Sequence, residues 1–244
     1  MPMDCRLCGE ILREPIYTNA APSLTSTMQS VPYVYELFVC NSCGHAQSPD
    51  FPNIDTFYAD EYNISLDSYT HDQIITTKDN ISYFRTDFQA QEILRLVTIP
   101  PKAKVLDYGC AKASTLKKLL AKRKDIVPYV FDVSDRYLPF WHGWVLAENM
   151  ACHTIPFNWS KSFDLITLHF VLEHVIEPVQ LLGALAALLT EDGQVFFLVP
   201  DATTNPGDLI VCDHLNHFTI ETLKYAATAA GLSIEYCDYT EFPG

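Results

Sequence analysis

The stretch Lys104-Val105-Leu106-Asp107-Tyr108-Gly109-Cys110-Ala111-Lys112-Ala113-Ser114 decides the fold of this 244-residue chain. An apolar run suited to a β-strand ends near an acid, and a glycine turn, small residues and a helix-forming segment over 114–124 follow it. Small residues let a ligand approach the backbone, and the start of a helix presents free N–H groups. The stretch therefore predicts strand, loop and helix around a nucleotide pocket at the carboxyl edge of a parallel sheet.

The spacing of the small residues discriminates between ligands. A dinucleotide fingerprint has glycines at its first, third and sixth positions, which here are Gly109, Ala111 and Ser114. This match is poor, so a nicotinamide oxidoreductase is disfavoured. Every second residue after Asp107 gives Gly109, Ala111 and Ala113 instead. An ordinary buried strand with a glycine turn is the alternative that this stretch alone leaves open.

The segments around this stretch alternate between helical and strand patterns. We expect a helix over 81–97, a second strand over 127–131 that ends at Asp132 and a helix over 180–189, and then a turn at Glu191-Asp192-Gly193 that leads into an apolar strand over 195–200. Asp132 follows Asp107 by 25 residues, where an acid at the end of a second strand accepts hydrogen bonds from ribose hydroxyls. This order predicts a doubly wound, Rossmann-like and mostly parallel sheet.

Two copies of the pattern Cys-x-x-Cys-Gly precede this α/β region. Their thiols belong to Cys5, Cys8, Cys40 and Cys43, and four thiolates form the closed tetrahedral set that structural zinc prefers. We therefore predict a small zinc-ribbon-like module over residues 1–50, with Zn²⁺ in a structural role and His45 as a neighbour of the metal. Four unrelated buried thiols are the alternative.

Between this module and the large domain lies a segment over 51–80, and the chain is rich in Pro, Asp and aromatic residues where this segment begins, over 47–60. We interpret it as a linker that drapes over the neighbouring domain, which takes residues 81–244. Its aromatic residues could close a pocket as a lid or could simply pack a connecting segment, and they are Tyr58, Tyr62, Tyr69 and His71.

Composition restricts the classes of partner. Lys and Arg total 16 against 30 Asp and Glu, a formal charge of −14 that disfavours a nucleic-acid substrate. Half of the basic residues lie within 102–124, either as the solvated face of a helix or as a landing site for a phosphate-bearing acceptor. The sequence contains neither a long apolar run nor a signal-peptide pattern, so we expect a cytoplasmic protein without membrane contact. The oligomeric state stays open.

Several motifs together resemble class I S-adenosylmethionine (SAM) methyltransferases over 104–239. Besides the first loop they are Ile155-Pro156-Phe157, Phe163-Asp164-Leu165 and Leu172-Glu173-His174, with Ala230-Gly231-Leu232 before a last strand. With the double cysteine pattern in front, the chain is similar to a subgroup that includes sugar C-methyltransferases acting on nucleotide-linked keto sugars. In that subgroup a zinc module is fused to the SAM domain.

The resemblance implies roles for individual residues around SAM. It assigns Asp107, Gly109, Ala111 and Ala113 to the SAM loop, Asp132 to the ribose, Val133 to the adenine flank and His169 to the methionyl end. Three departures from the family pattern are visible. The acid that contacts the adenine amine would fall near Ala151, the Tyr-x-Glu-His cluster is replaced by Val211-Cys212-Asp213-His214, and the chain stops after the sixth expected strand.

The sequence leaves the catalytic base open among three histidines. His214 and His217 follow the fifth expected strand, Asp213 could orient His214, and His174 follows the fourth. Histidine titrates near neutral pH and suits general base catalysis. We therefore predict a methyltransferase for a small-molecule acceptor, plausibly a sugar or nucleotide sugar. A catalytically decayed binding module that acts as a scaffold is the alternative, and so is a metal bound by His214, His217 and Asp213.

Overall fold

The computed structural model describes residues 2–53, 57, 74–78 and 81–240. The chain forms two compact units that interleave along the sequence. The cysteine unit comprises Met1–Phe57, Phe170–Ala186 and Leu198–Tyr239, and the sheet unit comprises Tyr58–His169, Ala187–Phe197 and Thr240–Gly244. The predicted lid residues Tyr58, Tyr62, Tyr69 and His71 lie outside the described residues. None of the described helices has the length and apolar character needed to cross a membrane.

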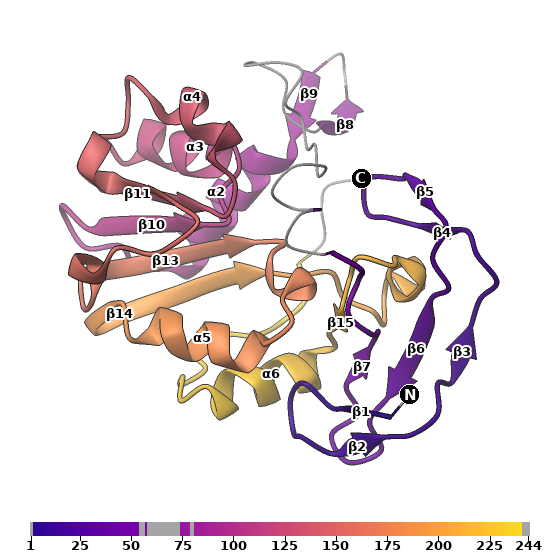
Figure 1. The fold of residues 1–244 in the computed structure, drawn as a ribbon. Helices are drawn as coiled ribbons and strands as arrows, with labels where there is room; N and C mark the ends of the chain where they lie inside the picture. The colour runs from indigo at the N-terminus through magenta and orange to yellow at the C-terminus, as the bar shows by residue number, and fades with distance from the viewer. Residues whose placement is uncertain (1, 54–56, 58–73, 79–80, 241–244) are drawn as a thin grey trace. The chain divides into compact units, whose positions relative to one another are not determined.

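The sheet unit is built on five parallel strands in the order β12-β11-β10-β13-β14 (Figure 1). They are β10 (Lys104–Tyr108), β11 (Val127–Asp132), β12 (Met150–Cys152), β13 (Phe163–His169) and β14 (Leu189–Leu198). The strand order reverses direction between β10 and β13, the topological switch point at which open α/β sheets bind ligands. The predicted Rossmann-like sheet is confirmed.

Helices α2 (Arg85–Leu96) and α3 (Ser114–Lys122) pack against each other beside this sheet. The helix predicted over 81–97 is wrong at its start, because Ile81–Phe84 forms strand β9, which pairs with β8 (Ile74–Lys78). The run Ile-Ser-Tyr-Phe is β-branched and aromatic, and these residues favour strands. Behind the sheet, buried apolar residues form one core that includes Ile93, Leu116, Val130, Trp141 and Leu165.

The remaining elements of the sheet unit are short. They are α4 (Leu138–Trp141) and the 3₁₀ helices η2 (Asp135–Tyr137), η3 (Ala147–Asn149) and η4 (Phe157–Trp159). The turn predicted at Glu191-Asp192-Gly193 lies inside β14 instead. A Cβ atom added at Gly193 would lie 2.6 Å from the carbonyl oxygen of Phe163 on β13, so the close approach of the two backbones explains the glycine.

The cysteine unit contains short antiparallel strands, as the ribbon-like prediction expects. A four-stranded sheet has the order β15-β7-β6-β3, formed by Asn216–His217, Ala46–Gln47, Glu36–Val39 and Tyr17–Thr18. Two hairpins complete it, β1 (Met3–Asp4) with β2 (Ile11–Leu12) and β4 (Ser23–Leu24) with β5 (Ser30–Val31). Strand β15 thus brings residues from the far end of the chain beside the second cysteine pair.

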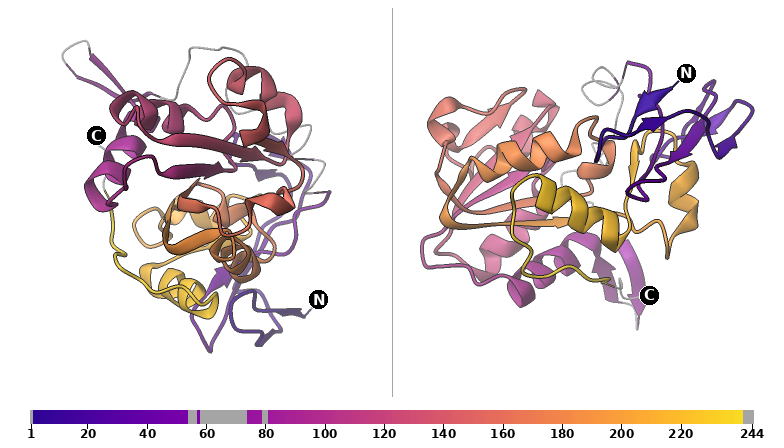
Figure 2. Two further views of the ribbon diagram at one scale, coloured as in Figure 1. Left: turned by 90° about the vertical axis from the view of Figure 1, so that its left-hand side faces the viewer. Right: turned by 90° about the horizontal axis from the view of Figure 1, so that it is seen from below.

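The cysteine unit also includes two helices that lie side by side, α5 (Pro178–Ala186) and α6 (Ile220–Ala229) (Figure 2). A capping box between Thr219 and Thr222 begins α6. The 3₁₀ helices η5 (Leu172–His174) and η6 (Pro206–Ile210) belong to the same unit. The strand predicted after Gly231 is wrong, because residues 232–240 carry no strand in the described part of the chain.

Candidate functional site: a nucleotide loop, a thiol cluster and a histidine cluster

The loop after β10 has the backbone of a glycine-rich turn although two of its positions are alanine. Gly109, Ala111 and Ala113 have φ angles of 66°, 47° and 54°, all in the left-handed region. This region costs an L-residue roughly 1–2 kcal/mol, so the alanines are strained in a conformation that glycine adopts freely. Trp141 holds the loop by donating its indole N–H to the Ala111 carbonyl at 2.7 Å. The loop therefore adopts a glycine-like backbone at two alanine positions.

Asp132 at the end of β11 lies directly beside this loop, as predicted. Its two carboxylate oxygens accept hydrogen bonds from the backbone N–H groups of Ala111 at 2.8 Å and Ser134 at 3.0 Å. Burial raises the pKa of Asp132, and only 6% of the residue is exposed. Each oxygen keeps a further lone pair, which a hydroxyl pair such as that of a ribose can use. Val133, 46% exposed, places an apolar surface next to that carboxylate.

Asp107 lies inside the sheet beneath the loop. Its carboxylate accepts a hydrogen bond from the Thr167 hydroxyl on β13 at 2.9 Å. Burial raises the pKa of Asp107 to about 7. The Asp107 carboxylate therefore bonds to the neighbouring strand and lies in the sheet beneath the loop.

His169 ends β13, next to β10 in the sheet. Among the described residues, no hydrogen-bond partner reaches either of its buried ring nitrogens. Burial lowers the pKa of His169 to about 3, so the ring is neutral at physiological pH. An orphaned buried imidazole at the carboxyl edge of the sheet fits a site that a polar ligand completes. Tyr108, Asp132 and His169 end three neighbouring strands at this edge.

Several basic residues near the loop are already engaged. The ammonium of Lys118 lies 2.8 Å from the carboxylate of Asp87, and Arg123 pairs with Asp125 at 2.9 Å. Lys112 and Lys117 lie 5.6 Å from the ring centres of Phe140 and Trp144, respectively. These contacts engage four of the eight basic residues within 102–124.

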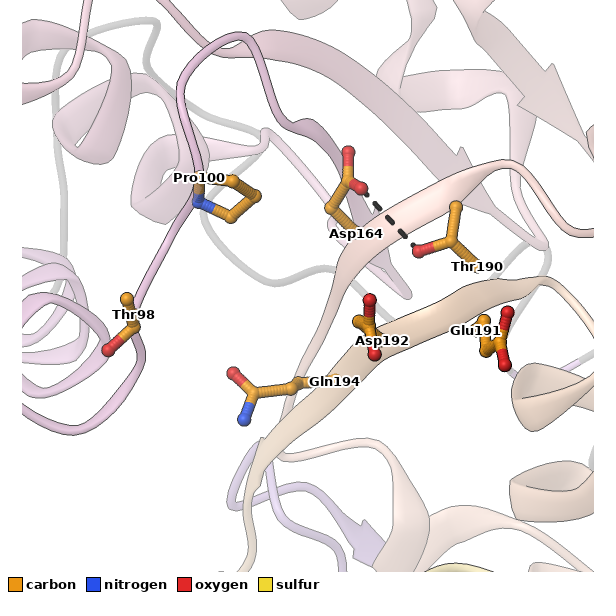
Figure 3. Close-up of a pocket in the computed structure, with 7 residues that line it drawn as sticks. All are labelled: Thr98, Pro100, Asp164, Thr190, Glu191, Asp192 and Gln194. Carbon is orange, nitrogen blue, oxygen red and sulfur yellow. Dashed lines mark hydrogen bonds between the residues drawn. The ribbon is translucent and has the colours of Figure 1, made fainter.

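A cavity of about 410 Å³ lies at the opposite edge of the sheet (Figure 3). It is lined by Asp164 near the start of β13, by residues 190–192 and Gln194 of β14, and by Thr98 and Pro100. In Figure 3 the Thr190 hydroxyl hydrogen-bonds to Asp164. Because β13 runs from Phe163 to His169, this cavity is at the amino edge and is separate from the loop that holds Asp132.

The four cysteines converge as the paired spacing predicts. The sulfur atoms of Cys5 and Cys43 lie 3.5 Å apart, as do those of Cys8 and Cys40, and all four lie within 4.8 Å of one another. In each Cys-x-x-Cys-Gly segment the glycine has a positive φ, and its backbone N–H donates to the carbonyl of the first cysteine of that segment at 2.8 Å. This donor set fits a closed tetrahedral zinc site. His45 points elsewhere, with its Nε2 3.1 Å from the Asn216 amide oxygen.

The segments that carry the cysteines bind residues 212–217 through several hydrogen bonds. Arg6, between Cys5 and Cys8, donates to the carbonyl oxygens of Ser48 at 2.6 Å and Leu215 at 2.9 Å. Ser48 donates its hydroxyl to the His214 carbonyl at 2.9 Å. The backbone around His214 is therefore fixed by the cysteine segments.

His214 and His217 share one carboxylate that the sequence analysis did not identify. Asp208 in η6 lies with one oxygen 2.5 Å from Nδ1 of His214 and the other 2.9 Å from Nδ1 of His217. Burial acts to raise the pKa of Asp208, but the two imidazoles hold it below its ordinary range. Asp208 is six residues from His214 on a separate turn, and no local spacing rule links the two.

The prediction that Asp213 orients His214 is wrong. The Asp213 carboxylate instead accepts two hydrogen bonds from Ser26, from its backbone N–H and its hydroxyl, both at 2.6 Å. The alternative metal set of His214, His217 and Asp213 is not brought together, because Asp208 bonds to the two imidazoles and Ser26 to Asp213.

His174 contacts His214 from a second segment. The ring centres are 4.7 Å apart and nearly perpendicular. Nδ1 of His174 bonds to the Asp213 carbonyl at 3.0 Å, and its Nε2 lies 3.9 Å from the Glu173 carboxylate. Burial and the neighbouring His214 lower the pKa of His174 to about 4. Burial also opposes protonation of His214, but the Asp208 carboxylate outweighs it and the pKa of His214 is raised. His214 is thus the more basic of the two.

Comparison with solved structures supports the fold. The methyltransferase in the Haloferax volcanii complex with the Trm112 methyltransferase activator is 16% identical, with a TM-score of 0.50 over 60% of this chain and 69% of that chain. CalO1, a methyltransferase in calicheamicin biosynthesis solved with S-adenosylhomocysteine (SAH), is 17% identical with a TM-score of 0.48, over 61% of this chain and 50% of that chain. This chain therefore spans about half the length of CalO1. No curated protein sequence matches it.

A family model described as a methyltransferase domain matches residues 81–236. This range includes the loop after β10, Asp132, His169 and the segment with Asp208 and His214. Together with the Rossmann-like sheet, the match supports SAM as the methyl donor. The chain belongs to the methyltransferase-domain family.

Proposed function

We propose that the protein transfers a methyl group from SAM to a small-molecule acceptor, a sugar or nucleotide sugar, with His214 as general base and Zn²⁺ held by Cys5, Cys8, Cys40 and Cys43. The observation that carries the proposal is the bonding of the Asp132 carboxylate to the Ala111 N–H at 2.8 Å. It joins the loop after β10 to the end of β11 at the carboxyl edge of the sheet, next to the switch point between β10 and β13.

The residues of the loop account for binding of the donor. Asp132 would accept the ribose hydroxyls, Val133 would flank the adenine, and His169 would serve the methionyl end. SAM, when bound, supplies a methyl group already activated by its sulfonium charge. The neutral state of His169 suits this charge, because a protonated imidazole would repel it.

On the acceptor side, the protein needs to remove one proton from the atom that is methylated. His214 can accept it at Nε2, since its Nδ1 is bonded to Asp208. Its raised pKa makes it a stronger proton acceptor than His174. His174, whose Nδ1 bonds to the Asp213 carbonyl, would orient the acceptor or the ring of His214.

The zinc assignment follows from the donor set. Four thiols within 4.8 Å of one another leave no coordination position for water, so the metal would hold the cysteine unit together and would not take part in the reaction. The segments that carry these thiols also bear the hydrogen bonds to the backbone of residues 214 and 215.

Isothermal titration with SAM and with SAH tests the donor site. We expect saturable binding to the wild-type protein and an affinity at least about tenfold weaker for Asp132→Asn, which loses one acceptor for the loop N–H groups. Asp135→Asn is the matched control, because that exposed acid lies three residues further along and its carboxylate lies 3.8 Å from Nε2 of His153, away from the loop. No saturable heat, or equal affinity for both variants, would overturn the proposal.

The acceptor class is tested by mass spectrometry after incubation with SAM and a panel of sugars and nucleotide sugars. We expect one of them to gain the mass of one methyl group. If the mass of a methyl group were gained only by proteins or nucleic acids in parallel incubations, the small-molecule assignment would be contradicted.

A further inference from the structure

A continuous line of hydrogen bonds connects four side chains, those of Tyr35, His217, Asp208 and His214. The position of each proton along it follows from which atoms can donate and which can only accept. All four residues are buried. The line begins at the carbonyl of Leu209, whose oxygen lies 2.6 Å from the hydroxyl of Tyr35. A carbonyl can only accept, so the single hydroxyl proton of Tyr35 points to Leu209.

This leaves the Tyr35 oxygen as an acceptor toward His217. Nε2 of His217 lies 2.9 Å away from it and must therefore carry a proton. On the other side of the ring, Nδ1 of His217 lies 2.9 Å from the Asp208 carboxylate. An ionised carboxylate accepts only, so this nitrogen carries a proton as well.

The second oxygen of Asp208 makes the same demand on His214. It lies 2.5 Å from Nδ1 of His214, which thus holds its proton there and keeps the lone pair on Nε2. Counting charges, a doubly protonated His217 is positive, Asp208 is negative and His214 is neutral. A buried carboxylate needs such a partner, because an isolated charge in the interior costs several kcal/mol.

We propose that the hydrogen bonds to Tyr35 and Asp208 hold His217 as an imidazolium, and that Asp208 acts as the positioning residue that fixes His214 with Nε2 free to accept a proton. The role of His214 as base rests on the function proposed above. The proton assignment itself rests only on the four side chains and the Leu209 carbonyl.

The groups around the line act on the two histidines in opposite directions. His214 is faced by Asp208, Glu173 and Asp213 and by the neutral ring of His174. His217 is faced by the Asp208 carboxylate, and the charge of Arg6 opposes its protonation, as a protonated His214 would. Burial lowers the pKa of His217 even with the Asp208 carboxylate beside it, so the assignment of both ring protons rests on the hydrogen bonds of Nδ1 and Nε2.

Nitrogen NMR of protein labelled with ¹⁵N-histidine tests the assignment without any turnover. Between pH 6 and 8.5 we expect one histidine with both ring nitrogens at imidazolium positions and one whose Nε2 alone titrates. His217→Asn and His214→Asn assign the two signals. A neutral His217 across this range would overturn the proposal, and so would a His214 protonated on Nε2 in its neutral form.

Two further variants separate positioning from simple stability. Asp208→Asn should leave His217 neutral and lower the turnover number at least about tenfold, while KM for SAM stays within twofold. Tyr35→Phe should lower the imidazolium signal of His217 and leave the Nδ1 proton of His214 in place, with a smaller loss of turnover. Asp201→Asn, in which the lost carboxylate bonds to Thr203 and Thr204, is the matched control with unchanged ring-nitrogen signals.

The outcomes distinguish this proposal from the proposed function. If no acceptor is methylated, the proposed function fails, and the ring-nitrogen spectrum of the free protein still decides the proton assignment. If Asp208→Asn lowers only the melting temperature while both histidine signals keep their wild-type form, Asp208 is structural and the positioning role is wrong.

Discussion

The loop beside Asp132 and the cluster around Asp208 are assembled in different ways. In the loop, Ala111 bonds to Asp132 across 21 residues and to Trp141 across 30, and the Asp107 carboxylate beneath it bonds to Thr167 on the adjacent strand across 60. In the histidine cluster, Ser26 bonds to Asp213 across 187 residues and Tyr35 to His217 across 182. The first region is therefore set by local chain geometry, whereas the second depends on the folding of the cysteine unit. Perturbations of the metal and of the sheet should consequently have separable effects.

Loss of the metal should have the largest effect. Chelation, or the double change Cys5→Ser with Cys43→Ser, should unfold the cysteine unit and abolish methyl transfer, because metal binding supplies much of the folding free energy of such modules. SAM affinity of the remaining folded protein should change less than about threefold. Metal content, circular dichroism and SAM titration check this.

Cys237→Ser is the control for the thiol changes, since that cysteine belongs to the same unit but not to the cluster. If chelation reduced SAM binding as much as methyl transfer, the expected independence of the loop from the cysteine unit would be contradicted.

His214→Gln should lower the transfer rate by about 100-fold with little change in SAM affinity, the opposite pattern to Asp132→Asn. In the wild type, the rate should fall as pH drops through a pKa above 6.5, because only neutral His214 accepts a proton and its pKa is raised. The measurement is a pH–rate profile at saturating SAM. His142→Gln, at an exposed position, should match the wild type.

Asp107→Asn should change the pH dependence of stability. The pKa of Asp107 is about 7 in the folded protein and near 3.8 when exposed, so its contribution favours folding at low pH and is lost as pH rises through 7. The wild type should therefore lose roughly 2–3 kcal/mol from this group between pH 5 and pH 8. The variant should lack this slope in urea unfolding, and exposed Asp192→Asn should retain it.

Ala111→Gly and Ala113→Gly should have the smallest effect. Glycine relieves the strain of a positive φ but adds entropy to the unfolded chain, so each change should stabilise by at most about 1 kcal/mol. Ala121→Gly in α3, where the backbone is helical, should instead destabilise by about 1 kcal/mol. Thermal unfolding of the three variants tests this. A loss of stability in Ala111→Gly or Ala113→Gly would mean that the alanine methyl group packs against neighbouring atoms.

The sequence predicted the sheet, the loop, Asp132 and the thiol set because each follows from periodicity or from spacing within one supersecondary unit. It failed at Ile81–Phe84 and at Gly193, where pairing of distant strands decides the backbone. Periodicity indicated a helix for the first and turn composition a loop for the second.

The same limit explains Asp208 and Tyr35. Each is an ordinary residue in its own segment, and only the approach of η6 and of the residues preceding β6 to His217 gives it a role. Asp213 shows the converse error, because adjacency in the chain suggested a bond to His214 while the carboxylate bonds to Ser26.

The pairing of β15 with β7 has a practical consequence for anyone who trims the chain. Residues 81–236 match the family model, and cutting at their start looks like an economical way to obtain a minimal enzyme. Such a truncation would remove Ala46–Gln47, the only strand partner of Asn216–His217 in the described structure, and would leave an unpaired strand edge exposed. A shortened protein of this kind should be prone to aggregate, so the amino-terminal segment belongs in any expression design.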